Sequence, residues 1–183
     1  MGVERLANES PQHRKRRAEL LEAEIALKDQ MERVSQLRRE LGPGTPLETD
    51  WMLQVGPDDL DSDAVPRKVK LSELFGEHDT LLLMHFMFGG SQKQLCPMCS
   101  MWADGYDAVV KHLSRRVAFA VEGRLETFRS FARERAWGRF RIVSSAGSSL
   151  KDDLGMQTPE GGQLPGVSVF SREIGRASCR ERV

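Results

Sequence analysis

The chain has 183 residues, and its 27 Lys and Arg side chains balance 27 Asp and Glu side chains. This length fits one domain with an appendage, and the zero net charge argues against a nucleic-acid-binding protein and against an acidic tail. No apolar run reaches the roughly 18 residues of a membrane span, and the polar N-terminus lacks a secretory signal, so we expect a cytoplasmic protein.

Residues 1–45 are predicted to form a helical arm. Apolar side chains recur every seven residues at Leu20, Leu27, Val34 and Leu41. The Gly-Pro-Gly sequence at 42–44 ends this helix. We favour packing of the helix against its own domain, and the same spacing leaves open a coiled-coil homodimer through this helix. The basic run at 14–17 indicates a solvated face rather than a nucleic-acid contact.

Residues 46–172 are predicted to form one domain of alternating strands and helices. We expect strands at 51–55, 67–70, 81–88, 117–121, 140–143 and 167–170. We expect a helical turn at 71–75, helices at 98–113 and 125–137, and a loop at 144–162. The helix predicted at 98–113 carries an apolar stripe of Met101, Trp102, Gly105, Val109 and Leu113. This alternation predicts βαβ units in a parallel or mixed sheet.

The last segment, residues 173–183, does not continue this pattern. The sequence from Ile174 to Val183 matches the translation of a common sequencing adapter. We therefore interpret 173–183 as a non-native tail that replaces the true C-terminus, with a genuine disordered basic tail as the alternative. Without the tail, two of the three cysteines remain, Cys96 and Cys99.

The strongest functional signal is Cys96-Pro97-Met98-Cys99, which lies between the most apolar predicted strand and a predicted helix. A Cys-x-x-Cys pair beside a βαβ pattern is typical of a thioredoxin-like redox site. The free N–H groups at a helix start stabilise a thiolate, which makes Cys96 the candidate nucleophile. Pro97 suits the first helical turn. Cys99, one turn further along, is the candidate resolving thiol, for which we expect a higher pKa.

Two other interpretations of the cysteine pair stay open. In the first, the pair binds zinc together with His85 and His112, although no second Cys-x-x-Cys or His-x-His pair supports a zinc site. In the second, both cysteines are unreactive core residues. We interpret His85 as a hydrogen-bonded core histidine and Asp104 as a solvated or hydrogen-bonding residue. No metal or other cofactor is expected.

Several stretches resemble an uncharacterised bacterial family, domain of unknown function 899, which is classed as thioredoxin-like. The His-Phe-Met-Phe-Gly run at 85–89 resembles the family's strand end, and the sequence from Cys96 to Asp104 resembles its helix start. Further similarities lie at 38–41, 112–113, 143–145 and 166–170. The chain departs from the family after the N-terminal helix, in the loop 90–95, and at 148–153. The last departure puts a substrate contact from that loop in doubt.

The resemblance implies an α/β fold, a thioredoxin-like three-layer α/β/α sandwich with an extra long N-terminal helix. It also implies a truncated protein with an incomplete sheet, because the family continues past the strand at 167–170. Thioredoxin-like folds carry a cis-proline facing the Cys-x-x-Cys pair, and Pro165 is the candidate for that position.

We therefore expect a thiol–disulfide oxidoreductase or a peroxide-handling relative. Cys96 would attack, Cys99 would resolve, and Pro97, Trp102 and Pro165 would contact the substrate. The expected partner is a protein or small-molecule thiol or disulfide. A non-catalytic binding module with a thioredoxin fold is the alternative.

Overall fold

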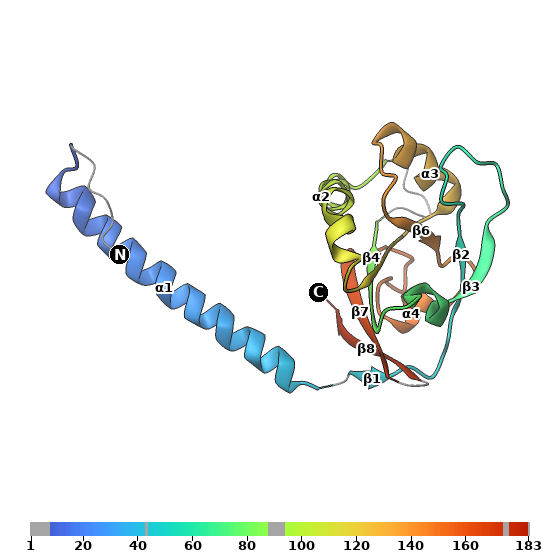
Figure 1. Ribbon diagram of the computed structural model, residues 1–183, viewed down its shortest axis with the longest axis horizontal. Helices are drawn as coiled ribbons and strands as arrows, with labels where there is room; N and C mark the ends of the chain where they lie inside the picture. The colour runs from blue at the N-terminus through green and yellow to red at the C-terminus, as the bar shows by residue number, and fades with distance from the viewer. Residues whose placement is uncertain (1–7, 43, 88–93, 174–175, 183) are drawn as a thin grey trace. The chain divides into compact units, whose positions relative to one another are not determined.

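The computed structural model describes residues 8–42, 44–87, 94–173 and 176–182, with side chains as far as residue 172 (Figure 1). The chain divides into two compact units, Met1–Gly42 and Pro43–Val183. No helix in the described ranges is long and apolar enough to cross a membrane.

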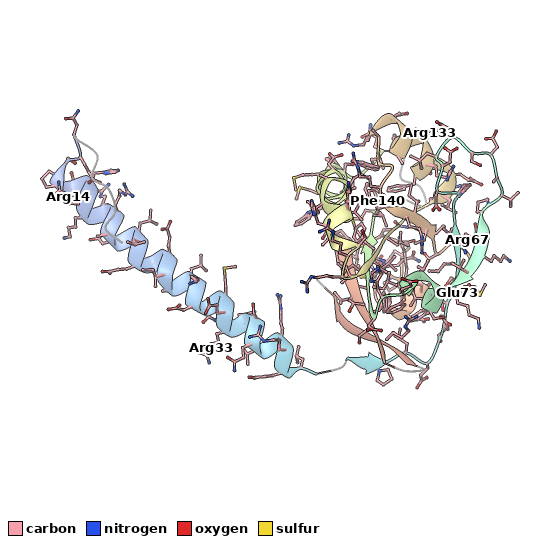
Figure 2. The ribbon with its side chains drawn as sticks, in the orientation of Figure 1. Arg14, Arg33, Arg67, Glu73, Arg133 and Phe140 are labelled. Carbon is pink, nitrogen blue, oxygen red and sulfur yellow. The ribbon has the colours of Figure 1, made fainter. Side chains whose placement is uncertain are left out.

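The first unit is the predicted long helix, α1 (Pro11–Glu40). Ser10 caps it, because its hydroxyl oxygen accepts a hydrogen bond of 3.2 Å from the His13 amide, and Pro11 occupies the first turn. Side chains project from α1 on all sides (Figure 2). No residue of α1 is buried within this unit. The packing of this helix against its own domain stays a prediction.

The second unit is built on one mixed sheet, which within the described residues has the order β1-β8-β7-β4-β5-β6-β2-β3. Its strands are β1 (Thr45–Pro46), β2 (Met52–Val55), β3 (Arg67–Lys70), β4 (Thr80–His85), β5 (Ala118–Glu122), β6 (Arg141–Ser144), β7 (Gly166–Glu173) and β8 (Arg176–Arg182). The neighbours β4, β5 and β6 are parallel, and all other pairs are antiparallel. Parallel neighbours need crossover connections, which α2 (Pro97–Leu113) and α3 (Leu125–Glu134) supply.

Helices cover both faces of the sheet. The apolar core on one face contains residues of α2 and α3, and the core on the other face contains residues of the 3₁₀ turn η1 (Leu71–Phe75) and of α4 (Leu150–Asp153). Alternate residues of β4 enter the two cores: Leu81 and Leu83 enter one, and Met84 enters the other. The structure is thus the predicted three-layer α/β/α sandwich, viewed in Figure 1.

The predicted apolar stripe on α2 lies on its exposed side. Met101, Trp102 and Val109 are 54%, 54% and 45% exposed. The buried side of α2 comprises Cys99, Ser100, Ala103, Asp107 and Val110. Hydrogen bonds to the two polar members explain this arrangement. The Asp107 carboxylate accepts from the backbone N–H and guanidinium of Arg139, and the Ser100 hydroxyl donates to the Cys96 carbonyl.

The last strand, β8, lies within the segment that we interpret as a non-native tail. Its backbone pairs with β7, from the pair of Glu173 and Arg176 to the pair of Ser168 and Arg182. On its other side it pairs with both residues of β1. Backbone ladders form with many side-chain sequences, so this pairing does not decide whether the tail is native. The interpretation as a tail, and the truncation that it implies, stay predictions. The loop expected at 144–162 contains α4, which the sequence analysis missed.

Candidate functional site

The cysteine pair lies at the start of α2, as predicted. Cys96 is the N-cap residue, with an extended backbone, and Pro97 is the first helical residue. The Cys96 sulfur accepts a hydrogen bond of 3.5 Å from the backbone N–H of Cys99. A free N–H group of the helix start is therefore directed at the Cys96 sulfur.

The two thiols have different surroundings. Cys96 is half-buried, whereas Cys99 is 2% exposed and packs into the core between α2, α3 and the sheet. Burial is the main cause that raises the pKa of the Cys99 thiol from 9.0 to about 11, and the neighbouring Cys96 adds to the rise. Cys99 therefore stays a thiol at neutral pH, as expected for a resolving residue.

Of the other predicted contact residues, Pro97 and Trp102 belong to α2, and Pro165 lies just before β7. Pro97 and Pro165 are exposed, and the ring of Trp102 stacks on Tyr106 with centroids 6.0 Å apart. Pro165 directly precedes β7, whose first residue, Gly166, pairs with His85 at the end of β4. The described residues contain no cis peptide bond, so Pro165, the candidate position for a cis-proline, has a trans bond. The 88–93 part of the predicted strand end and loop lies outside the described residues.

The structure does not assemble the alternative zinc site. His112 lies in the last turn of α2, about 24 Å along the helix axis from Cys96. His85 is fully buried on the sheet, and its Nε2 lies 2.8 Å from the Ser168 hydroxyl. In the described ranges no group of three or more His, Cys, Asp or Glu side chains is arranged to hold a metal ion. Asp104 is a hydrogen-bonding residue, as predicted, with partners Arg135 and Trp137.

A buried polar cluster, which the sequence analysis did not predict, lies on the sheet face opposite α2. It comprises His85, Glu122, Ser145, Lys151 and Ser168, all buried. The Glu122 carboxylate accepts a hydrogen bond of 2.7 Å from the Ser145 hydroxyl and forms an ion pair of 2.9 Å with the Lys151 ammonium. Lys151 also donates to the side-chain oxygen of Gln163 at 3.1 Å.

Glu122 is held in its charged form within this cluster. Burial alone would raise its pKa, but His85, the Lys151 charge and the Ser145 hydroxyl outweigh burial and hold the pKa below its ordinary value. His85 Nδ1 lies 3.7 Å from Glu122 Oε2 and has no hydrogen-bond partner among the described residues. Ser168 is fully buried, so the Ser168–His85–Glu122 arrangement has no accessible nucleophile.

The sequence does contain a signal for this cluster, which is the presence of polar residues where predicted strands end. His85 and Glu122 end the parallel strands β4 and β5, and Ser145 follows β6 directly. Because parallel strands end at the same edge of a sheet, these three side chains come together there. Lys151, in contrast, comes from α4, and only the packing of α4 brings it to Glu122.

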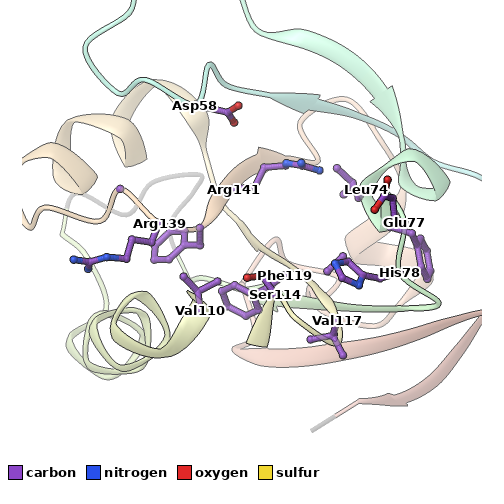
Figure 3. A pocket seen from close by; sticks show the side chains of 15 residues that line it. Asp58, Leu74, Glu77, His78, Val110, Ser114, Val117, Phe119, Arg139 and Arg141 are labelled. Carbon is purple, nitrogen blue, oxygen red and sulfur yellow. The ribbon is translucent and has the colours of Figure 1, made fainter. Parts of the chain in front are cut away.

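Two cavities lie at opposite ends of the parallel strands. The first, about 480 Å³, lies at their carboxyl ends and is lined by Glu122, Arg124, Ser145, Lys151 and Gln163, among others. The second, about 440 Å³, lies near their amino ends, and Figure 3 shows Glu77, His78, Val110, Phe119 and Arg139 around it. Neither cavity is lined by Cys96 or Cys99.

The three-layer sandwich, with a Cys-x-x-Cys pair at a strand-to-helix junction, defines a thioredoxin-like protein. Solved structures with this fold include the 2-Cys peroxiredoxin of Plasmodium vivax, with 12% identity and a TM-score of 0.55. The match covers 76% of this chain and 83% of the peroxiredoxin chain. Another is a putative thioredoxin reductase from Burkholderia cenocepacia, with 15% identity and a TM-score of 0.55. The match covers 77% of this chain and 85% of that chain. At these identities the similarity concerns the fold alone.

The family is shown by a separate comparison. The chain belongs to the family described as bacterial protein of unknown function (DUF899), which matches residues 3–178. This agrees with the resemblance inferred from the strand end at His85 and the helix start at Cys96. No curated protein matches the chain in sequence.

Proposed function

We propose that this protein is a thiol–disulfide oxidoreductase that uses Cys96 as nucleophile and Cys99 as resolving thiol. The observation that carries the proposal is the asymmetry of the pair. The half-buried Cys96 sulfur accepts a helix N-terminal hydrogen bond, while the Cys99 thiol is buried with its pKa raised to about 11. Two equivalent core cysteines would not differ in this way.

In the proposed reaction, the Cys96 thiolate attacks one sulfur of a substrate disulfide. The substrate S–S bond breaks, a mixed disulfide forms on Cys96, and the first substrate thiolate leaves. Cys99 then loses its proton and attacks the Cys96 sulfur, which releases the second substrate thiolate. The substrate gains two electrons, the Cys96–Cys99 pair becomes a disulfide, and an external thiol reductant restores the dithiol.

The exposure of the three predicted contact residues is compatible with a substrate contact. Pro97 and Pro165 are exposed and Trp102 is 54% exposed. An apolar surface next to a reactive thiol suits an extended segment of a disulfide-bonded protein, whereas a small disulfide would use little of it. The proposed reaction fits a reducing cytoplasm, where dithiol pairs are kept reduced.

The test is reduction of insulin, a protein disulfide, and of oxidised glutathione, a small disulfide, in the presence of dithiothreitol. We expect Cys96→Ser to lower the catalysed rate by at least about a hundredfold. When the reduced protein is mixed with substrate in the absence of dithiothreitol, we expect Cys99→Ser to accumulate a mixed disulfide on Cys96, detectable by mass spectrometry. The matched control is Cys179→Ser, which removes the third cysteine and should leave the rate unchanged.

Hydrogen peroxide is tested as an alternative oxidant, because solved structures with this fold include peroxiredoxins. Consumption of peroxide that needs Cys96, without reduction of either disulfide, would replace the proposed activity by a peroxidase. No catalysis with any of the three substrates, together with partner binding that survives Cys96→Ser, would favour the non-catalytic binding module.

A further inference from the structure

The cavity at the carboxyl ends of the parallel strands is lined by polar residues that the thiol chemistry does not use. It has a volume of about 480 Å³, and all of its lining residues belong to the second unit. Among the described residues that line it, Ala146 is the only one with an apolar side chain. Open α/β sheets bind ligands outside the carboxyl ends of their strands, so the place and the lining of this cavity both suit a small polar ligand.

Lys151 brings a buried positive charge to this cavity, with one hydrogen-bond donor to spare. Its ammonium has three N–H donors. The Glu122 carboxylate at 2.9 Å and the side-chain oxygen of Gln163 at 3.1 Å take up two of them. Within the described part of the chain the third N–H has no acceptor, although the Lys151 side chain is only 8% exposed. Buried donors in proteins are normally paired, so this N–H is available to an acceptor atom of a ligand.

Two serine hydroxyls of the lining are also left as donors. The Ser144 oxygen accepts a hydrogen bond of 3.2 Å from the Ala146 N–H, and the Ser148 oxygen accepts one of 3.3 Å from the Leu150 N–H. Neither hydroxyl donates to an acceptor in the ranges that the structure describes, and Ser144 is buried. A hydroxyl that accepts one bond can still donate another, so both serines can donate to a ligand.

Arg124 adds a second cation to the lining. Its guanidinium has five N–H donors, and its ion pair among the described residues is a long one, 4.0 Å to the exposed Glu126. Two carboxylates also line the cavity, but Glu122 is neutralised by Lys151, and Asp152 is exposed. The lining therefore offers a ligand several unused donors, two of them on cations.

We propose that this cavity binds a small ligand through an anionic oxygen group, either a carboxylate or a phosphate. Such a group supplies acceptor atoms and negative charge, which match the unused donors and the cations of the lining. The buried ion pair then has a binding role, because Glu122 holds the Lys151 ammonium in place while its remaining N–H donates to the ligand. The exposed Asp152 opposes an anion, so binding is modest, with a dissociation constant of about 1 mM or lower.

The test is a nuclear magnetic resonance titration of the full chain, labelled with nitrogen-15 and kept reduced, at constant ionic strength. Inorganic phosphate and acetate are the probes. We expect the amide signals of Gly123, Gly147 and Ser148 to shift and to saturate with at least one of these anions, at about 1 mM or below. The anion that binds more tightly identifies the group as a phosphate or a carboxylate. Glycerol, which is uncharged, should give no saturating shift up to about 20 mM.

Exposed variants change the charge of the lining in opposite directions. Arg124→Gln should raise the dissociation constant at least about tenfold, because it removes a charged donor. Asp152→Asn should lower it, because it removes a like charge. The matched control is Arg116→Gln, an exposed arginine outside the lining, which should leave the affinity unchanged. Cys96→Ser should also leave it unchanged, because Cys96 does not line the cavity.

A double variant tests the buried cation. Glu122→Gln with Lys151→Met removes the ammonium without leaving a charge unpaired, and it should weaken binding as Arg124→Gln does. The absence of a saturating shift with either anion overturns the proposal. An equal response to glycerol, or an affinity that Arg124→Gln leaves unchanged, also overturns it. None of these outcomes bears on the reduction of disulfides, which is measured with other substrates.

Discussion

Cys96 and Cys99 are three positions apart, yet the fold gives them different chemistry. Cys96 caps the helix and remains partly accessible, while Cys99 faces the core between α2 and the sheet. The difference arises because Cys96 is the N-cap residue with an extended backbone, whereas Cys99 lies in the first turn of the helix on its buried side. The proposed division of roles between nucleophile and resolving thiol rests on that geometry.

The first prediction at this scale concerns the pH dependence of cysteine alkylation. With a pKa of about 11, Cys99 holds only about one part in a thousand as thiolate at pH 8. In the native protein at pH 8, iodoacetamide should therefore modify Cys96 and leave Cys99 largely unmodified. Mass spectrometry after proteolysis would measure both sites. Equal modification of both cysteines in the folded protein would contradict the assigned roles.

The same raised pKa makes stability depend on alkaline pH. A folded pKa above the unfolded value favours the protonated thiol in the folded state. Its contribution is therefore fully present below pH 9.0 and is lost as the pH rises towards 11. The free energy of unfolding should fall over this window by less in Cys99→Ala than in the unchanged chain. Identical pH profiles for the two proteins would show that the Cys99 thiol does not titrate differently on folding.

A further prediction at the residue scale concerns the buried Glu122–Lys151 ion pair. Glu122→Gln leaves the Lys151 charge buried without its partner and should cost about 3–5 kcal/mol of unfolding free energy. Replacing both residues, with Glu122→Gln and Lys151→Met, should cost less than the sum of the single changes. Urea unfolding of the three variants measures the coupling. Additive costs would mean that the pair contributes nothing as a pair.

Acid titration provides an independent check on Glu122. Its pKa is lowered on folding, so its contribution is present above 4.5 and is lost as the pH falls through the lower folded value. The difference in unfolding free energy between the unchanged chain and Glu122→Gln should therefore become smaller as the pH falls below 4.5.

At the scale of elements, α2 is held to the sheet by polar contacts as well as by its apolar residues. The buried Asp107 carboxylate accepts from the Arg139 backbone N–H at 2.9 Å and from its guanidinium at 2.7 Å. These bonds connect the middle of α2 to the segment before β6. They explain why the buried side of α2 contains a carboxylate, and they free the apolar stripe for the solvent side.

The element-scale prediction is that Asp107→Ala destabilises the second unit by about 2–3 kcal/mol. The substitution leaves the Arg139 N–H without its partner and removes a charge-assisted hydrogen bond. Glu126→Ala, on the exposed first turn of α3, is the control and should change stability by less than about 0.5 kcal/mol. Similar small effects from both substitutions would show that the Asp107 contacts do not hold α2 in place.

At the scale of the whole molecule, the burial of side chains differs between the two units. The apolar residues of α1 are exposed, with Leu27 at 60%, whereas Phe128 of α3 is fully buried. We expect Phe128→Ala to cost about 3–5 kcal/mol in the cooperative unfolding of the second unit. Leu27→Ala should change that transition by less than about 0.5 kcal/mol. A large effect of Leu27→Ala would indicate that α1 packs into a core after all.

Most of the elements, and the position of the cysteine pair, could be predicted from the sequence. The signals for these elements are local: apolar runs at 81–85 and 118–121, glycines that stop helices, and the Cys-Pro-x-Cys start of α2. Such signals can be read from a short stretch of sequence, without knowing which residues pack against it. β3 agrees with its prediction at both ends, whereas the short helix α4 was missed because four residues are too few for a periodic pattern.

The sequence by itself determined the α/β class, the order of the longer strands and helices from β2 to β7, and the presence of a cysteine pair at a helix start. Only the tertiary structure decided which side of α2 is buried, because Asp107 and Ser100 are compatible with the core once Arg139 and the Cys96 carbonyl satisfy them. It also decided that Lys151 neutralises Glu122, which lies 29 positions earlier in the chain. Such contacts join residues distant in sequence, and no local pattern encodes them.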